Sequence, residues 1–211
     1  MKLQTAIDRI SIEEAEELAQ QLNGKTDILE MGTSLVKDYG NVAIWRMRQK
    51  LTQTTLLVDS KTIDEGAYEF NQAFHYGGDI VTVMGAASYD TLVACYKVAQ
   101  KENKTMMIDL LEVSDEKIAA IKDFPGAIYA LHHSIDRKDK LDAVATVAAF
   151  HEKFPTIKRL AIAGGIDLEQ TKKLAQQGLL EVVIVGSKIA KAQDPIKAVN
   201  EFMEAIHYEN N

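Results

Sequence analysis

The densest group of reactive side chains is the segment Asp59-Ser60-Lys61-Thr62-Ile63-Asp64, which follows a short apolar run. In an extended chain alternate side chains share a face, so Asp59 and Lys61 are expected to point the same way, with Asp64 beyond them in a loop. A lysine among carboxylates stays cationic and can stabilise an oxyanion, whereas a lysine desolvated near other cations becomes a Schiff-base nucleophile. The acidic neighbours favour the electrostatic role, and a surface salt bridge is the alternative without chemistry.

Three further acids and a histidine close other apolar runs, namely Asp8, Glu30, Asp109 and His132. An acid after a strand is often only the N-cap of the next helix, and this alternative stays open for Asp8. Only one of two adjacent strand residues can face inward, so we select His132 rather than the histidine that follows it.

Glu30 and Asp59 offer carboxylate oxygens, the hard ligands that suit Mg²⁺. This ion usually takes one or two carboxylates and completes its shell with water and substrate oxygens. The sequence lacks the Cys/His clustering typical of zinc. A magnesium site at Glu30 and Asp59 is therefore predicted, although two such carboxylates could equally hold a lysine.

Glycines follow the last two apolar runs, at Gly164-Gly165 and at Gly186-Ser187. Glycine lets the backbone N–H groups approach a phosphate closely, and loops after the last two strands of a barrel commonly bind one. The alternative is that both are tight turns that need glycine for backbone reasons alone. Their placement after both runs favours a phosphorylated substrate.

These side chains would meet only if the runs they follow are parallel strands. Longer segments with helical spacing separate the runs, as in residues 11–22, where Ser11 and Glu14 predict a capping box. The eight apolar runs are Leu3–Ile7, Ile28–Met31, Thr55–Val58, Ile80–Val83, Thr105–Ile108, Ala127–Leu131, Arg159–Ile162 and Val182–Val185.

Strands that alternate with helices indicate a parallel sheet, and eight such units predict a single (β/α)8 TIM barrel over residues 1–211. In this fold the active site lies at the carboxyl ends of the strands, where the reactive side chains stand. An open doubly wound sheet is the second choice, but the first turn has no glycine and such sheets more often have five or six strands.

Composition narrows the class of protein further. The net charge of −7 argues against a general nucleic-acid binder, which needs a basic face. No apolar run approaches the roughly 18 residues that span a bilayer, so we expect a cytoplasmic protein. The single cysteine, Cys95, is expected to be buried on the apolar side of a helix.

The motif Asp59-x-Lys61-x-x-Asp64 and its surroundings resemble the orotidine monophosphate decarboxylase suprafamily. Within it the chain is similar to the 3-hexulose-6-phosphate synthases and the 3-keto-L-gulonate-6-phosphate decarboxylases. The resemblance runs from the first strand to the last helix. The residues that carry it are Asp8, Lys2-Leu3-Gln4, Glu30-x-Gly32-Thr33, Ala163-Gly164-Gly165-Ile166 and Val185-Gly186-Ser187.

The resemblance implies a homodimer with shared active sites, in which Asp64 reaches into the partner's site beside Lys61. It also implies Mg²⁺ as the cofactor and a cis-enediolate of a sugar phosphate as the intermediate. The synthases add formaldehyde to the enediolate of ribulose 5-phosphate, and the decarboxylases form an enediolate by losing CO₂ and then protonate it. The implied roles are magnesium ligation by Glu30 and Asp59, substrate and enediolate binding by Asp8 and Lys61, and acid/base work by Asp109 and His132.

Two positions depart from the decarboxylase pattern, because Ile135 and Ser187 stand where that group typically has arginine. The segment from His132 to Lys140 also departs from the usual synthase sequence. We therefore expect a synthase-like aldehyde-lyase, with the decarboxylase as the alternative. A barrel that binds a sugar phosphate without turnover is a third reading, which the Asp59, Lys61 and Asp64 array argues against.

Overall fold

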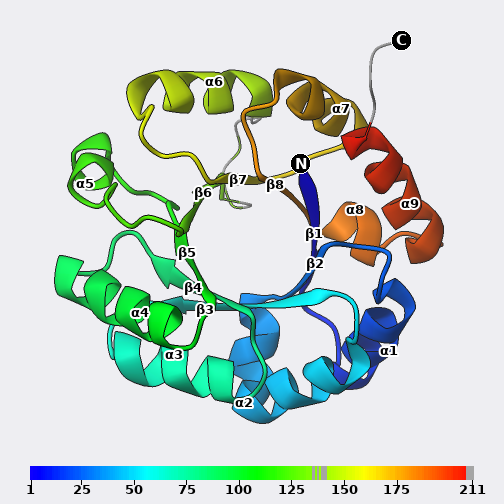
Figure 1. Ribbon diagram of the computed structural model, residues 1–211. Helices are drawn as coiled ribbons and strands as arrows, with labels where there is room; N and C mark the ends of the chain where they lie inside the picture. Colours follow the sequence, from blue (N-terminus) through cyan, green and yellow to red (C-terminus); the bar gives the residue numbers. More distant parts are fainter. Residues whose placement is uncertain (135, 137, 139–141, 208–211) are drawn as a thin grey trace.

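The computed structural model describes residues 1–134, 136, 138 and 142–207. Eight parallel strands follow one another around a closed barrel, each paired with its neighbours in sequence and the last with the first. The helices form the outer layer of the molecule (Figure 1). The predicted (β/α)8 barrel is confirmed, and the open doubly wound sheet is wrong.

All eight predicted strands are present: two match their predicted bounds, five differ by one residue at one or both ends, and the third is longer. Their apolar, β-rich composition suits strands that are covered on both faces. The strands are β1 (Lys2–Ile7), β2 (Ile28–Met31), β3 (Thr55–Thr62), β4 (Ile80–Met84), β5 (Thr105–Asp109), β6 (Ile128–His132), β7 (Leu160–Ala163) and β8 (Val182–Val185).

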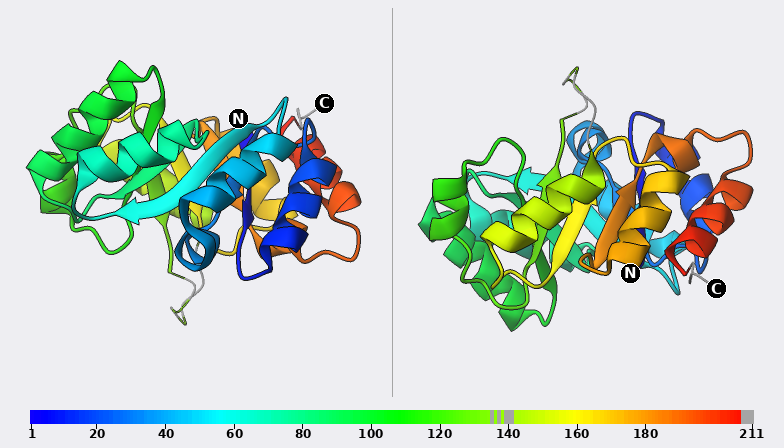
Figure 2. Two further views of the ribbon diagram at one scale, coloured as in Figure 1. Left: turned by 90° about the horizontal axis from the view of Figure 1, so that it is seen from below. Right: turned by 90° about the horizontal axis from the view of Figure 1, so that it is seen from above.

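Helices connect successive strands and pack their apolar faces on the outside of the barrel (Figure 2). The predicted capping box is confirmed, since the Ser11 and Glu14 side chains each bond the other's backbone N–H. The helices are α1 (Ile12–Leu22), α2 (Thr33–Lys50), α3 (Gly66–His75), α4 (Tyr89–Lys101), α5 (Asp115–Ala120), α6 (Ala143–Lys153), α7 (Leu168–Gln177), α8 (Ser187–Ala190) and α9 (Pro195–Ile206).

The core has two layers, one inside the barrel and one between the strands and the helices. The outer layer is the larger and contains Cys95, which is fully buried as predicted. Apolar side chains from β2 to β8 fill the barrel interior, as in other barrels of this fold. They are Ile28, Leu57, Ile80, Met107, Ile128, Ala130, Ala161 and Val182.

Strand β3 is longer than predicted, because it continues past Val58 to Thr62. Its pairing with β4 shifts on the way: Val58 lies opposite Val81, but Thr62 lies opposite Val83. Asp59, Ser60 and Lys61 of β3 thus stand opposite the single residue Thr82 of β4 and form a bulge, with two more residues than the partner strand has there. Within the bulge Lys61 has a φ of 48°, in the left-handed region that costs a non-glycine residue about 1–3 kcal/mol.

Among the residues that the structure describes, no helix is both long and apolar enough to cross a membrane.

Candidate active site

A cavity of about 650 Å³ opens at the carboxyl ends of the strands, where the fold places active sites. Ten of the eleven site residues predicted from the sequence line it. They are Asp8, Glu30, Asp59, Lys61, Asp109, His132, Gly164, Gly165, Gly186 and Ser187.

Asp64 is the eleventh, and it lies outside this cavity. It is exposed in the loop between β3 and α3, beside Ile63, whose exposed fraction is 54%. The prediction placed it beyond the strand, and the structure agrees. Its expected contact with a partner chain is not tested by one chain alone.

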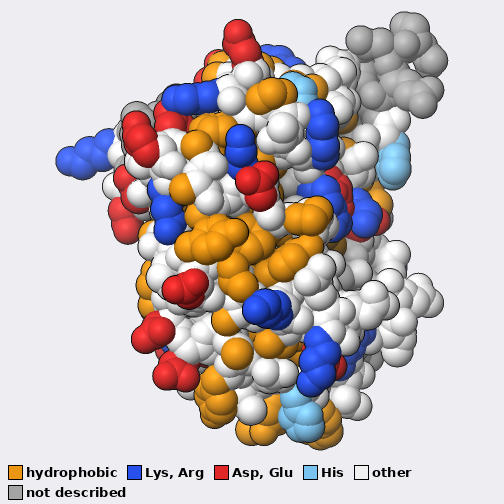
Figure 3. Space-filling model, turned by 60° about the vertical axis from the view of Figure 1, so that its left-hand side comes forward, with side chains coloured by type: hydrophobic (Ala, Val, Ile, Leu, Met, Phe, Trp, Pro, Cys, Tyr) orange, Lys and Arg blue, Asp and Glu red, His pale blue; other side chains and the backbone are white. Residues whose placement is uncertain are grey.

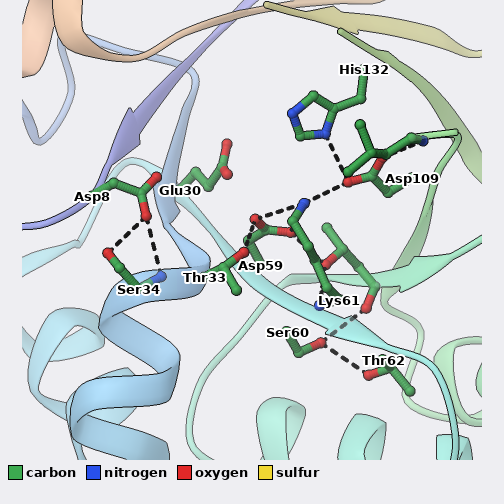
Figure 4. A network of polar contacts seen from close by, with 12 residues as sticks. Asp8, Glu30, Thr33, Ser34, Asp59, Ser60, Lys61, Thr62, Asp109 and His132 are labelled. Atoms are coloured by element: carbon green, nitrogen blue, oxygen red, sulfur yellow. Dashed lines mark hydrogen bonds and ion pairs between the residues drawn. The ribbon is translucent and has the colours of Figure 1, made fainter. Parts of the chain in front are cut away.

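Lys61 joins carboxylates from two strands at the floor of the cavity (Figure 4). Its Nζ donates to Asp109 Oδ2 at 2.5 Å and lies 3.2 Å from Asp59 Oδ2. Burial by itself lowers the pKa of Lys61. The charges of Asp59 and Asp109 raise this pKa by more than burial lowers it, so the pKa lies above its ordinary range. Lys61 is therefore a fixed cation rather than a neutral amine, as the sequence predicted.

Asp59 and Lys61 face the same cavity, but strict strand alternation is not the reason. The bulged backbone at Lys61 turns the chain there. Hydroxyl groups from two other elements then hold Asp59: Thr33 Oγ1 donates to its Oδ2 at 2.5 Å, and Thr82 Oγ1 donates to its Oδ1 at 2.8 Å. No local sequence pattern marks Thr82 as a site residue, because its neighbours in β4 are apolar.

His132 stands across Asp109 from Lys61, with Nδ1 2.9 Å from Asp109 Oδ2. Burial raises the pKa of Asp109, but hydrogen bonding and charge from His132 and Lys61 outweigh it and lower the pKa to about 2. An ionised Asp109 can only accept a hydrogen bond, so the Nδ1–H of His132 donates to it. The other ring nitrogen, Nε2, is then available to exchange a proton with a substrate. The next residue, His133, also lines the cavity. His132 is the histidine that contacts Asp109, whereas His133 lies past the end of β6, where strand alternation no longer applies.

Asp8 caps the first turn of α2 from a separate loop, because the N-cap residue of that helix, Gly32, has no side chain. Its Oδ1 accepts from the backbone N–H of Ser34 at 3.2 Å and from the Ser34 hydroxyl at 2.8 Å, near the start of α2. Gly32 leaves room for it, since a Cβ there would lie 2.2 Å from the Asp8 carboxyl group. Asp8 thus combines a capping role with a position on the cavity wall.

Glu30 is a buried carboxylate of the cavity, with an exposed fraction of 8%. It accepts a hydrogen bond from Gln4 Nε2 at 2.6 Å. Burial, and then the charge of Asp59, raise the pKa of Glu30 to about 8. Lys61 binds Asp59 and Asp109, so the alternative of a lysine between Glu30 and Asp59 is not what the structure shows.

Glu30 and Asp59 contribute carboxylate oxygens, the ligand type that a hard divalent cation prefers. The described residues contain no group of three or more His, Cys, Asp or Glu side chains that would hold a metal. Mg²⁺ needs only one or two carboxylates, with water and substrate oxygens as its other ligands. A cation would also offset the repulsion between two buried carboxylates that raises the pKa of Glu30.

The two glycine loops lie together on the cavity wall. Gly164 has a φ of 126°, and a Cβ there would lie 2.7 Å from His133 Cβ, so the backbone itself requires glycine. At Gly186 a Cβ would meet nothing closer than 3.8 Å. The tight-turn alternative therefore accounts for Gly164, but packing leaves the space at Gly186 open to a ligand.

Basic side chains that the sequence analysis did not single out also reach this cavity. Arg9 follows Asp8, and Lys188 and Lys191 follow the second glycine loop. Their positions after β1 and β8 are the only signal that could have identified them. They make the side of the cavity that carries the glycine loops more positive.

The sequence departs from the family patterns at Ile135 and at its neighbours 137, 139 and 140, and these positions lie outside the described residues.

The fold and the site together define a class of protein, a barrel enzyme with an acid and lysine network at the mouth and a basic, glycine-lined wall. The chain belongs to the orotidine 5'-phosphate decarboxylase / HUMPS family, whose model matches residues 1–202. The resemblance inferred from the motifs is thereby confirmed.

Named relatives give a finer comparison. The chain is 34% identical to proteins named 3-hexulose-6-phosphate synthase from Staphylococcus aureus and Staphylococcus haemolyticus, over 98% of this chain and 99% of each relative. A crystal structure of 3-hexulose-6-phosphate synthase superposes with a TM-score of 0.89 at 33% identity, covering 98% of this chain and all of the other. The same enzyme from Salmonella typhimurium gives 0.88 at 29% identity, over 98% of this chain and 99% of that one. The prediction of an enzyme of the carbon–carbon lyase class is confirmed.

Proposed function

We propose that this enzyme is a 3-hexulose-6-phosphate synthase, which adds formaldehyde to the enediolate of ribulose 5-phosphate. The observation that carries the proposal is the chain of contacts from Asp59 through Lys61 and Asp109 to His132. It sets a fixed cation beside a histidine in one cavity. An enediolate needs both, a positive group for its charge and a base for the proton whose loss creates it.

The residues divide the reaction between them. His132 Nε2 takes a proton from C1 of ribulose 5-phosphate, while Asp109 holds the ring through Nδ1. The enediolate carbon then forms a bond with the carbon of formaldehyde, and the formaldehyde oxygen takes up the proton that His132 Nε2 holds, which returns the histidine to its starting state. Lys61 stabilises the negative charge that exists only during these steps.

Magnesium belongs to this proposal, with Glu30 and Asp59 as its protein ligands. Bound Mg²⁺ would polarise the ketose oxygens and favour loss of the C1 proton. The buried carboxylate pair and the raised pKa of Glu30 support this assignment.

A phosphate group is proposed to rest on the loops of Gly164, Gly165, Gly186 and Ser187. The open space at Gly186 and the nearby Lys188 and Lys191 support this placement. Since sugar phosphates are metabolites of the cytoplasm, we propose that the enzyme acts there.

The test is consumption of ribulose 5-phosphate by the purified enzyme, with and without formaldehyde and with and without EDTA. We expect loss of substrate only when formaldehyde is present, and we expect EDTA to abolish it. If formaldehyde has no effect, while 3-keto-L-gulonate 6-phosphate releases CO₂, the decarboxylase is the correct assignment. If neither substrate is turned over, the protein is a barrel that binds a sugar phosphate without catalysis.

We further propose a homodimer in which Asp64 completes the partner's site. Several large hydrophobic side chains are exposed on successive elements from α2 to α4, which a partner would cover. Figure 3 shows hydrophobic side chains gathered on the side of the molecule that lies at the left in Figure 1. The exposed residues of these elements are Tyr39, Val42, Trp45, Ile63, Tyr68 and Tyr89.

A further inference from the structure

Thr82 of β4 contacts each of the three residues in the β3 bulge. Its hydroxyl accepts from the backbone N–H of Lys61 at 2.9 Å and donates to Asp59 Oδ1 at 2.8 Å. Its carbonyl oxygen accepts from Ser60 Oγ at 2.9 Å. The side chain is almost fully buried, with an exposed fraction of 3%, so water does not readily replace these bonds.

The direction of both hydroxyl bonds is determined by chemistry. A backbone N–H can only donate, so the Thr82 oxygen accepts from Lys61. The hydroxyl then has one proton left, which it donates to Asp59 Oδ1. A single hydroxyl thus links the backbone of the lysine to the side chain of its carboxylate partner.

The backbone at Lys61 needs such a restraint. A lysine at a φ of 48° lies in a conformation that the residue rarely adopts, and the bulge removes the regular ladder bonds to β4. The bond from the Lys61 N–H to Thr82 replaces the missing ladder contact. Without it, the Lys61 backbone could relax and carry Nζ away from Asp59 and Asp109.

We propose that Thr82 is a positioning residue for the reaction, which holds Lys61 and Asp59 in register through its hydroxyl group. The inference rests on the proposed function for its kinetic readout, but the geometric readout needs no substrate. Thr82 itself acts through Lys61 and Asp59 and is not assigned any contact with the reacting atoms.

The test compares Thr82→Val, which removes the hydroxyl at nearly constant volume, with Thr82→Ser, which keeps it. We expect Thr82→Val to lower kcat by about 10- to 100-fold with little change in KM, since small misplacements of catalytic groups have effects of this size. Thr82→Ser should stay close to the parent. The control is Thr5→Val, a fully buried threonine on β1 whose hydroxyl bonds only away from the cavity, to Thr26 and not to any site residue.

Amide hydrogen exchange provides the readout that does not depend on activity. The Lys61 N–H should exchange at least about 10-fold faster in Thr82→Val than in the parent or in Thr82→Ser, because its acceptor is gone. If the parent fails to make the hexulose phosphate, the proposed function fails while this measurement still tests Thr82. If Thr82→Val does not fold, Thr82→Cys, with a weak donor of similar size, takes its place.

Two results would overturn the proposal. One is a kcat for Thr82→Val within about twofold of the Thr5→Val control, together with unchanged protection of the Lys61 amide. The other is a Thr82→Ser enzyme as impaired as Thr82→Val, because the hydroxyl would then not be the group that matters.

Discussion

Lys61 is held by the carboxyl groups of two aspartates, Asp59 and Asp109, so its charge does not depend on the substrate. The shortest of its contacts, 2.5 Å to Asp109 Oδ2, comes from a strand two places further along the barrel. Its raised pKa excludes a neutral amine at physiological pH. These features favour electrostatic stabilisation over Schiff-base chemistry.

We predict that Lys61→Ala lowers kcat by about 10²- to 10³-fold, as loss of a preorganised group does, and changes KM much less. The reason is that the enediolate charge exists in the transition state and not in the bound ketose phosphate. Steady-state kinetics with ribulose 5-phosphate measures both constants. A covalent adduct on Lys61, trapped by borohydride and seen by mass spectrometry, would contradict the electrostatic role.

Glu30→Gln is predicted to weaken Mg²⁺ binding by about 10-fold or more, because it removes one charge from a shell of hard ligands. Calorimetric titration with Mg²⁺ measures this without turnover. Glu181→Gln provides the matched control, since Glu181 pairs with Arg159 near the amino ends of the strands, away from the cavity. Equal affinity in both variants would exclude Glu30 as a ligand.

Asp109 predicts a pH dependence of stability. Its pKa is about 2 in the folded protein, below its ordinary value of 3.8, so ionised Asp109 stabilises the fold above about pH 4. This contribution is lost as the pH falls from about 4 towards 2. The free energy of unfolding of the parent, minus that of Asp109→Asn, should therefore shrink by about 2 kcal/mol over this range. Urea unfolding at several pH values measures it, and a constant difference would mean that the pKa of Asp109 is not lowered.

At the scale of elements, the site depends on contacts between neighbouring βα units. Asp8 follows β1 but caps α2, and Thr33 of α2 bonds Asp59 within β3. Thr82 of β4 holds the β3 bulge. Each functional side chain is thus oriented by an element other than its own.

Asp8→Asn separates the two roles of Asp8. Asparagine caps a helix about as well as aspartate, so the free energy of unfolding should change by less than about 0.5 kcal/mol. The lost charge should nevertheless lower kcat/KM by about 10-fold, if Asp8 helps to hold the substrate. Asp8→Ala should also lose about 1 kcal/mol of stability with the cap. If Asp8→Asn kept the kcat/KM of the parent, Asp8 would act only as a helix cap.

At the scale of the whole molecule, the shared site makes a quantitative prediction for mixed subunits. Lys61→Ala and Asp64→Asn should each be inactive alone. After the two variants are unfolded and refolded together, random pairing makes about half of the dimers mixed, and each mixed dimer regains one intact site of two. Activity should therefore reach about one quarter of the parent value.

The measurement is the synthase assay on the refolded mixture, with light scattering to determine the mass. Each variant refolded alone is the control. An inactive mixture of dimers, or an active monomer, would contradict the shared site.

The sequence alone determined the fold and the members of the site. Eight apolar runs, separated by helical spacing and helix caps such as Ser11 with Glu14, are local patterns that survive in any context. Because parallel strands bring their carboxyl ends to one rim, the residues closing those runs had to meet there. Ten of the eleven named residues line the cavity for this reason.

Only the tertiary structure decided how these residues are held. The bulge at Lys61, the hydroxyl of Thr82 and the capping of α2 by Asp8 all depend on the register between neighbouring strands. Register is a relation between segments far apart in the chain, and no local periodicity encodes it. The physical reason is that a side chain's partner is set by which element lies beside it, whereas its place at the rim is set by its own strand.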